Sequence, residues 1–221
     1  LTVTFINLKG KEKETDTWYY EDGLRDYLVT STAGWEKIPE DPFIGEFSGD
    51  TEAVNWALLW MPEGGDLITE SYVNLIPTAQ GGSHLNGFKA GLLESLKEFC
   101  EFRNLLPKGL KLSADDVLQN AAFIISSKLK DPQFAGQTKE RLDSKDHQAF
   151  VAASSKDALS IWFNQHTEEG EMIAELAIES AQKRTKEVKV VERKKSFQGP
   201  ALPGKLLSLI HISEPTRHRY I

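Results

Sequence analysis

The stretch that most constrains the fold is an apolar run at residues 54–60, which reads VNWALLW. It lies within a predicted strand at residues 52–61, and it is apolar enough to be buried on both faces over part of its length. Residues 43–47 and 67–76 are predicted as neighbouring strands, because turn residues separate them from this run. Connections this short predict an antiparallel meander. Residues 39–42, with two prolines and two acids, are predicted as a linker ahead of it.

Helical patterns follow these strands. Apolar residues recur at steps of three and four, which predicts one buried helix face made of Leu85, Phe88, Leu92, Leu96 and Phe99. Gly81 and Gly82 predict a strand-to-helix turn, and Ser83 is placed to cap the helix. Ser113 and Asp116 form a capping-box pattern for a second, short helix.

A further strand and two more helices complete the pattern. Residues 121–129 predict a strand, and residues 149–165 predict a helix. Residues 168–170 predict an interruption before a last helix at residues 171–195, whose first turns are expected to pack through Met172, Ile173, Leu176 and Ala177. At the other end of the chain, residues 1–8 and 15–20 predict a hairpin, followed by a short helix at 24–30.

The loop between the strand at 121–129 and the next helix carries the most suggestive chemistry. Residues 131–142 read DPQFAGQTKERL, and Pro132 and Gly136 keep this stretch out of regular structure. Gln137 and Lys139 lie at its tip. A lysine ammonium is a mobile point charge suited to a phosphate oxygen, and a glutamine amide donates two hydrogen bonds. Taken alone, a loop lysine is usually ordinary exposed surface.

The last predicted helix becomes strongly basic in its second half, where it contains Lys183, Arg184, Lys186, Lys189, Arg193, Lys194 and Lys195. Such a run is usually a solvated helix face. Its functional interpretation is contact with a phosphate backbone. The net charge of −7 argues against a protein coated uniformly for nucleic acid, so any DNA contact must be local.

Several kinds of site are excluded by the sequence. Cys100 is the only cysteine, which rules out an intrachain disulfide and suits a reducing cytoplasm. The histidines show no metal-ligand spacing, and no Walker-type or dinucleotide-binding glycine motif occurs. His84 is predicted to be a packed or capping histidine rather than a catalytic base. No run is long and apolar enough to span a membrane, and no signal peptide is apparent.

Two stretches, taken together, resemble a known family. Residues 72–88 read YVNLIPTAQGGSHLNGF, and with the Gln-Thr-Lys loop they are similar to the B subunits of bacterial type IIA topoisomerases. The resemblance extends over residues 1–206. It implies an α+β fold, with a mixed sheet covered by helices, a left-handed crossover and a long C-terminal helix. This is the transducer domain of the GHKL ATPase topoisomerases.

The resemblance also implies residue roles and partners. Gln137 and Lys139 would contact the γ-phosphate of ATP, with Lys139 as the one catalytic element, and the basic helix would attract double-stranded DNA. The Mg²⁺ ligands and the general base would lie in domains outside this chain, so the isolated chain is expected to be inactive. The implied partners are a topoisomerase A subunit and a second copy of the B subunit, in a cytoplasmic, nucleoid-associated enzyme.

The implied organisation divides the chain into four parts. Residues 1–29 would be the tail of the ATPase domain, 30–197 the transducer domain, and 198–206 the linker to the DNA-cleavage domain. Residues 207–221 match nothing expected of that domain and are predicted to be non-native, disordered sequence. Because the chain begins with Leu1 rather than Met, it is expected to be a fragment.

Three alternatives stay open. The sequence of residues 60–65 and 69–77 favours the topoisomerase IV branch of the family over the gyrase branch. A different class of function is a non-catalytic nucleic-acid-binding module that uses the basic helix. The third is an inert fragment that lacks its partner domains.

Overall fold

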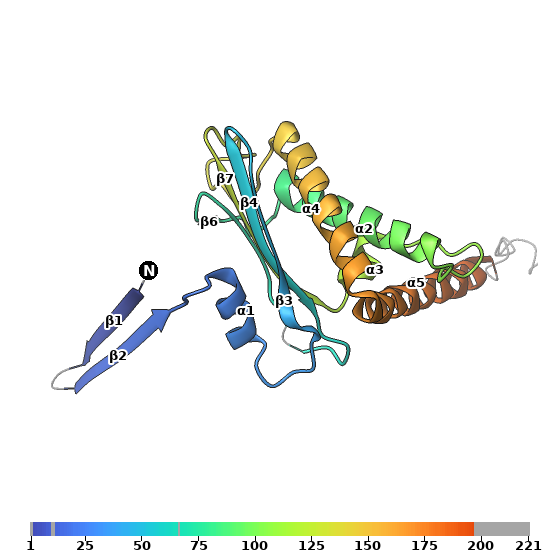
Figure 1. The fold of residues 1–221 in the computed structure, drawn as a ribbon, viewed down its shortest axis with the longest axis horizontal. Coiled ribbons are helices and arrows are strands. Elements are labelled where there is room, and N and C mark those ends of the chain that lie inside the picture. The colour runs from blue at the N-terminus through green and yellow to red at the C-terminus, as the bar shows by residue number, and fades with distance from the viewer. Residues whose placement is uncertain (1, 10–11, 66, 197–221) are drawn as a thin grey trace, which may run out of the picture. The chain divides into compact units, whose positions relative to one another are not determined.

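The computed structural model describes residues 2–9, 12–65 and 67–196. Its centre is a five-stranded sheet with the strand order β3-β4-β7-β5-β6 (Figure 1). The strands are β3 (Ile38–Ser48), β4 (Glu52–Trp60), β5 (Thr69–Val73), β6 (Ile76–Pro77) and β7 (Ala121–Leu129). The pair β5–β7 is parallel and the other neighbours are antiparallel. The predicted mixed sheet is therefore confirmed.

The predicted meander is wrong in its third strand. β7 lies between β4 and β5, and it pairs with β4 along the whole length of both strands, from Glu52–Leu129 to Trp60–Ala121. The short β5 offers fewer backbone partners, so the nine-residue β7 makes the longer ladder with β4. This pairing joins residues far apart in sequence, which connection lengths do not reveal.

Two strand boundaries also differ from the prediction. The expected strand at 67–76 ends at Val73, because Asn74 and Leu75 adopt positive φ angles of 49° and 66° and turn the chain into β6. The Asn74 amide continues the ladder by exchanging two 2.9 Å hydrogen bonds with the backbone of Leu129. The predicted linker at 39–42 lies inside β3, where the register with β4 shifts between Ile38 and Phe43.

One face of the sheet is covered by helices α2 (Ser83–Phe102), α3 (Ala114–Leu118) and α4 (Lys145–Gln165) (Figure 1). The first half of α5 (Thr167–Ser196) joins the same core through Ile173, Ala174 and Ala177. Of the predicted α2 face, Phe88, Leu92, Leu96 and Phe99 are buried, whereas Leu85 is half-buried. The capping box of α3 is confirmed, since Ser113 and Asp116 bond each other's backbone. Aromatic rings fill the core below α2, with Trp56 stacked on Phe47.

Glycines bring α2 and α4 unusually close. A Cβ atom on Gly87 would lie 2.4 Å from the carbonyl oxygen of Gln148, and one on Gly91 would lie 2.1 Å from the Ser155 hydroxyl. Real Cβ atoms do not approach other atoms this closely, so only glycine fits at both positions. The two helices therefore pack backbone against backbone at the end where both begin.

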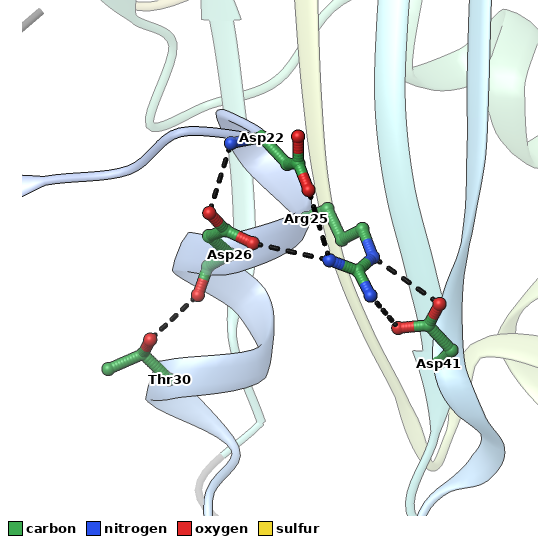
Figure 2. Close-up of polar contacts among 5 residues, drawn as sticks. All are labelled: Asp22, Arg25, Asp26, Thr30 and Asp41. Carbon is green, nitrogen blue, oxygen red and sulfur yellow. Dashed lines mark hydrogen bonds and ion pairs between the residues drawn. The ribbon is translucent and has the colours of Figure 1, made fainter.

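The other face of the sheet is partly covered by α1 (Leu24–Ser31), which agrees with the helix predicted at 24–30. Leu28 is fully buried against Ala57 and Leu59 of β4, so this strand is buried on both faces as its sequence predicted. Arg25 ties α1 to β3 through two contacts with the Asp41 carboxylate, at 2.8 and 3.3 Å (Figure 2).

Figure 2 also shows that Asp22 and Asp26 contact the same guanidinium, at 3.2 and 3.4 Å. A paired arginine–carboxylate contact fixes orientation as well as distance. The domain boundary predicted at residue 29 falls within α1, and it stays a prediction.

Ahead of α1, β1 (Thr2–Lys9) and β2 (Glu12–Tyr19) form the predicted antiparallel hairpin. Its apolar side chains, including Phe5 and Trp18, are about half exposed. A two-stranded hairpin is marginal in water without a further layer. We therefore expect the hairpin to be the least stable part of the described chain.

The last two helices begin earlier than predicted. α4 starts at Lys145 rather than at 149, and α5 starts at Thr167, so residues 168–170 lie in its first turn. The break between them falls at His166, and acids in the first turn of α5 favour that start. Met172 is 48% exposed and does not pack as predicted, whereas Ile173 and Ala177 are buried.

The predicted linker at 198–206 and the tail at 207–221 lie outside the described residues. Among the helices that are described, none is long and apolar enough to cross a membrane.

Candidate functional site

The predicted loop joins the end of β7 to the start of α4, and its own backbone closes its base. Phe134 and Leu142 form an antiparallel bridge, and the N–H of Ala135 donates to the carbonyl of Arg141 at 2.9 Å. Residues 136–140 therefore form the tip of a small closed hairpin rather than an open coil.

Gly82 lets a second stretch of backbone run against this base. The N–H of Leu142 donates to the carbonyl of Gly81 at 3.1 Å, and the N–H of Ser83 donates to the carbonyl of Leu142 at 2.9 Å. A Cβ atom on Gly82 would lie 2.3 Å from that carbonyl oxygen, and its φ of 132° suits glycine alone. The predicted turn at Gly81 and Gly82 is confirmed, and these glycines dock the loop.

The prediction that Ser83 caps α2 is wrong. The N-cap is Gly82, which makes no side-chain bond there. The Ser83 hydroxyl instead accepts a 3.0 Å hydrogen bond from the N–H of Ser144, which is the N-cap residue of α4. This contact ties the starts of α2 and α4 to each other directly at the base of the loop.

The tip presents the residues predicted to bind nucleotide. Gln137 and Lys139 are both exposed, and Lys139 has a positive φ of 57°. The Lys139 ammonium lies 6.0 Å from the centre of the Phe134 ring, at the outer limit of a cation–π contact. Within the described ranges, no carboxylate lies within 4.0 Å of this ammonium. Its charge is therefore available to an anion.

The acid beside Lys139 is engaged elsewhere. Glu140 accepts a 2.7 Å hydrogen bond on its carboxylate from the Gln80 side chain, and its carbonyl accepts a 3.0 Å bond from the N–H of Gln80. Gln80 thus bonds this carboxylate at a position more than 4.0 Å from the Lys139 ammonium. Sequence reasoning missed this residue, because no local pattern links side chains 60 positions apart.

The basic residues predicted to contact DNA lie on α5. Lys183, Arg184 and Lys186 are exposed. The backbone of α5 continues through the remaining four, but the side chains of Lys189, Arg193, Lys194 and Lys195 lie outside the described residues.

His84 is a packed histidine, as predicted. It is fully buried, and its Nε2 lies 3.2 Å from the Thr78 hydroxyl. Burial, and after it the neighbouring His147, lowers the pKa of His84 to about 4. His84 is therefore neutral at pH 7.

The exposed lysine of the loop can attract an anion, but the described residues do not provide a metal site for hydrolysis. Among the described residues, no group of three His, Cys, Asp or Glu side chains could hold a metal ion. The exposed Lys139 ammonium carries an unneutralised positive charge on a fixed backbone, and such a charge attracts anionic groups.

Comparison with known proteins decides the family. The family model described as DNA gyrase B matches residues 23–193. The chain belongs to the DNA gyrase B family. This confirms the resemblance to the B subunits of type IIA topoisomerases.

The similar curated proteins are named as B subunits of DNA topoisomerase 4. The proteins from Haemophilus influenzae and Escherichia coli are each 59% identical to this chain, over 93% and 91% of its length. The match covers 32% of each of those proteins, so this chain spans about a third of their length.

Two solved structures share the fold. The topoisomerase IV ATP-binding domain of Francisella tularensis, in complex with a small-molecule inhibitor, is 40% identical with a TM-score of 0.68, covering 78% of this chain and 46% of that one. The 43K ATPase domain of Thermus thermophilus gyrase B, in complex with an aminocoumarin, has a TM-score of 0.71 at 22% identity, covering 86% and 51%. At that identity the second match shows the fold alone.

Proposed function

We propose that this chain is the transducer segment of a topoisomerase B subunit, in which the Gln-Thr-Lys loop senses the γ-phosphate of ATP. The observation that carries the proposal is the exposed Lys139 ammonium at the tip of a loop fixed by backbone hydrogen bonds, with no carboxylate of the described residues within 4.0 Å of it. Family membership and the 59% identical relatives, named as topoisomerase 4 B subunits, support the branch.

The loop provides a difference between nucleotide states. ATP has a γ-phosphate and ADP does not, so Lys139 and Gln137 would gain contacts in only one state. Only such a difference can shift a conformational equilibrium. Lys139 would also stabilise charge that develops on this phosphate during transfer.

The helices would carry the shift away from the nucleotide. Leu142 is bonded to the start of α2, and α2 packs backbone against backbone on α4. The loop and these two helices should therefore move as one body. An ATPase domain outside this chain would supply the general base and bind Mg²⁺.

The coupled reaction would be passage of one DNA duplex through another, in the cytoplasm and at the nucleoid. The partners would be a topoisomerase A subunit and a second copy of the B subunit. The exposed Lys183 and Lys186 would attract double-stranded DNA without reading its sequence. We place the chain in the topoisomerase IV branch rather than the gyrase branch on the 59% identity.

The test uses residues 1–206 joined behind the ATPase domain of the Escherichia coli relative. We expect Lys139→Ala to lower ATP turnover by roughly a hundredfold, the scale for one preorganised charge at a transition state. Lys130→Ala is the matched control, because Lys130 is an exposed lysine at the foot of the same loop. Equal turnover in the two variants would contradict the proposal.

A further inference from the structure

Two buried histidines lie next to the base of the loop, one in the first turn of α2 and one in the first turn of α4. His84 is 0% exposed and His147 is 1% exposed. The two helices touch just before this pair, where Ser144 donates to Ser83. They touch again just after it, at Gly87. The two imidazoles therefore lie in the same layer of the α2–α4 interface.

Each imidazole uses one ring nitrogen for a hydrogen bond toward the sheet. His147 Nδ1 lies 2.5 Å from Glu52 Oε2, at the start of β4. His84 Nε2 contacts Thr78, whose hydroxyl lies 2.7 Å from the Ser71 hydroxyl on β5. The pair thus ties two helix starts to two strands that are not neighbours in the sheet.

The other nitrogen of each ring, Nδ1 of His84 and Nε2 of His147, is buried and has no hydrogen-bond partner among the described residues. When a buried polar group already has one unbonded atom, losing its remaining hydrogen bond destabilises the structure further. Charges of both signs surround the His147 side, where a 430 Å³ cleft is lined by Glu52 and also by Lys130, Asp131, Asp143, Lys145 and Asp146. On the α2 side, His84 bonds Thr78 and is close enough to His147 to be affected electrostatically.

We infer that His84 and His147 are positioning residues for Lys139, because they fix the first turns of α2 and α4 against the sheet. The loop base is bonded to residues 81 and 83, immediately before His84, and α4 begins two residues before His147. A change in the imidazole bonds therefore shifts both supports of the loop. This role in turnover rests on the proposed function of the loop, whereas the fixing of the base does not.

The first measurement is amide hydrogen exchange on the 221-residue chain, with the amides of Leu142 and Ser83 as reporters of the loop base. In His147→Leu, which leaves Glu52 without its partner, we expect these amides to exchange roughly tenfold faster. His147→Asn places an amide N–H near the position of Nδ1, which restores a donor to Glu52 and should recover most of the protection. His166→Gln is the control, because His166 lies at the other end of α4.

The second measurement is ATP turnover in the chain joined behind the ATPase domain. We expect kcat per folded molecule to fall in His147→Leu and to recover in His147→Asn, while KM for ATP changes less. Unchanged exchange at Leu142 and Ser83 in His147→Leu would overturn the inference, whatever happens to turnover. Faster exchange that His147→Asn does not slow would overturn it too, because the donor to Glu52 would then be irrelevant. The proposed function fails separately, through unchanged turnover in Lys139→Ala.

Discussion

The buried imidazole of His84 makes the stability of this fold depend on pH. His84 has no exposed surface and no carboxylate partner among the described residues, and burial is the main cause that lowers its pKa to about 4. In the unfolded chain its pKa returns to about 6.5. Between these values the unfolded chain binds a proton that the folded chain does not, so acidification favours unfolding.

We therefore expect the free energy of unfolding to fall as the pH drops from about 6.5 to about 4, with His84 contributing up to about 3 kcal/mol of the loss. The measurement is urea denaturation at a series of pH values. His84→Gln removes the titrating group and should show a shallower decline over that window. Parallel declines in the two proteins would contradict this account of His84.

At the scale of elements, the close contact of α2 and α4 decides whether replacing a glycine by alanine stabilises or destabilises the chain. Alanine in a helix is normally more stable than glycine by up to about 1 kcal/mol. At Gly91, however, the added Cβ would lie 2.1 Å from the Ser155 hydroxyl and 2.5 Å from the Ala152 carbonyl oxygen. The second atom is backbone and cannot rotate away.

Gly91→Ala should consequently destabilise the chain by about 1–3 kcal/mol, the usual cost of overpacking. Thermal unfolding followed by circular dichroism measures this effect. Ala90→Ser changes the exposed neighbouring position on the same helix and serves as the control. A stabilised Gly91→Ala protein would show that the helices are not in backbone contact.

The helices and strands also show which features of the fold can be predicted from sequence patterns. Periodicity located most strands and helices, because burial on one face or on both leaves a local signature, as at residues 54–60 and on the α2 face. It did not reveal that β7 separates β4 from β5, since strand order depends on contacts distant in sequence. Nor did it reveal that the Ser83 hydroxyl bonds Ser144.

The sequence predicts the residues at the tip of the candidate site but not the residues that support them. The loop chemistry and the family resemblance point to Gln137 and Lys139, and both residues lie at an exposed tip as expected. Their supports were missed, because Gln80, Glu52 and His147 reach the loop and its base only through tertiary packing. Their roles at the nucleotide stay predictions.

At the scale of the whole molecule, the basic part of α5 should act on DNA and not on ATP. A double variant in which Gln replaces both Lys183 and Lys186 lacks two exposed cations. In the chain joined behind the ATPase domain, we expect the slope of log affinity for duplex DNA against log salt to become shallower by about 1.8, at about 0.9 per lost phosphate contact. ATP turnover without DNA should stay unchanged. An unaltered salt slope would place the DNA contacts elsewhere.

The central claim is that Lys139 distinguishes ATP from ADP, and hydrogen exchange at residues 136–139 tests it most directly. The measurement uses the chain joined behind the ATPase domain, with a non-hydrolysable ATP analogue or with ADP. The account predicts slower exchange at the tip with the analogue alone, because only that ligand has a γ-phosphate for Lys139 to contact, and it predicts loss of this protection in Lys139→Ala. Equal exchange with both nucleotides, or protection that survives in Lys139→Ala, would contradict it.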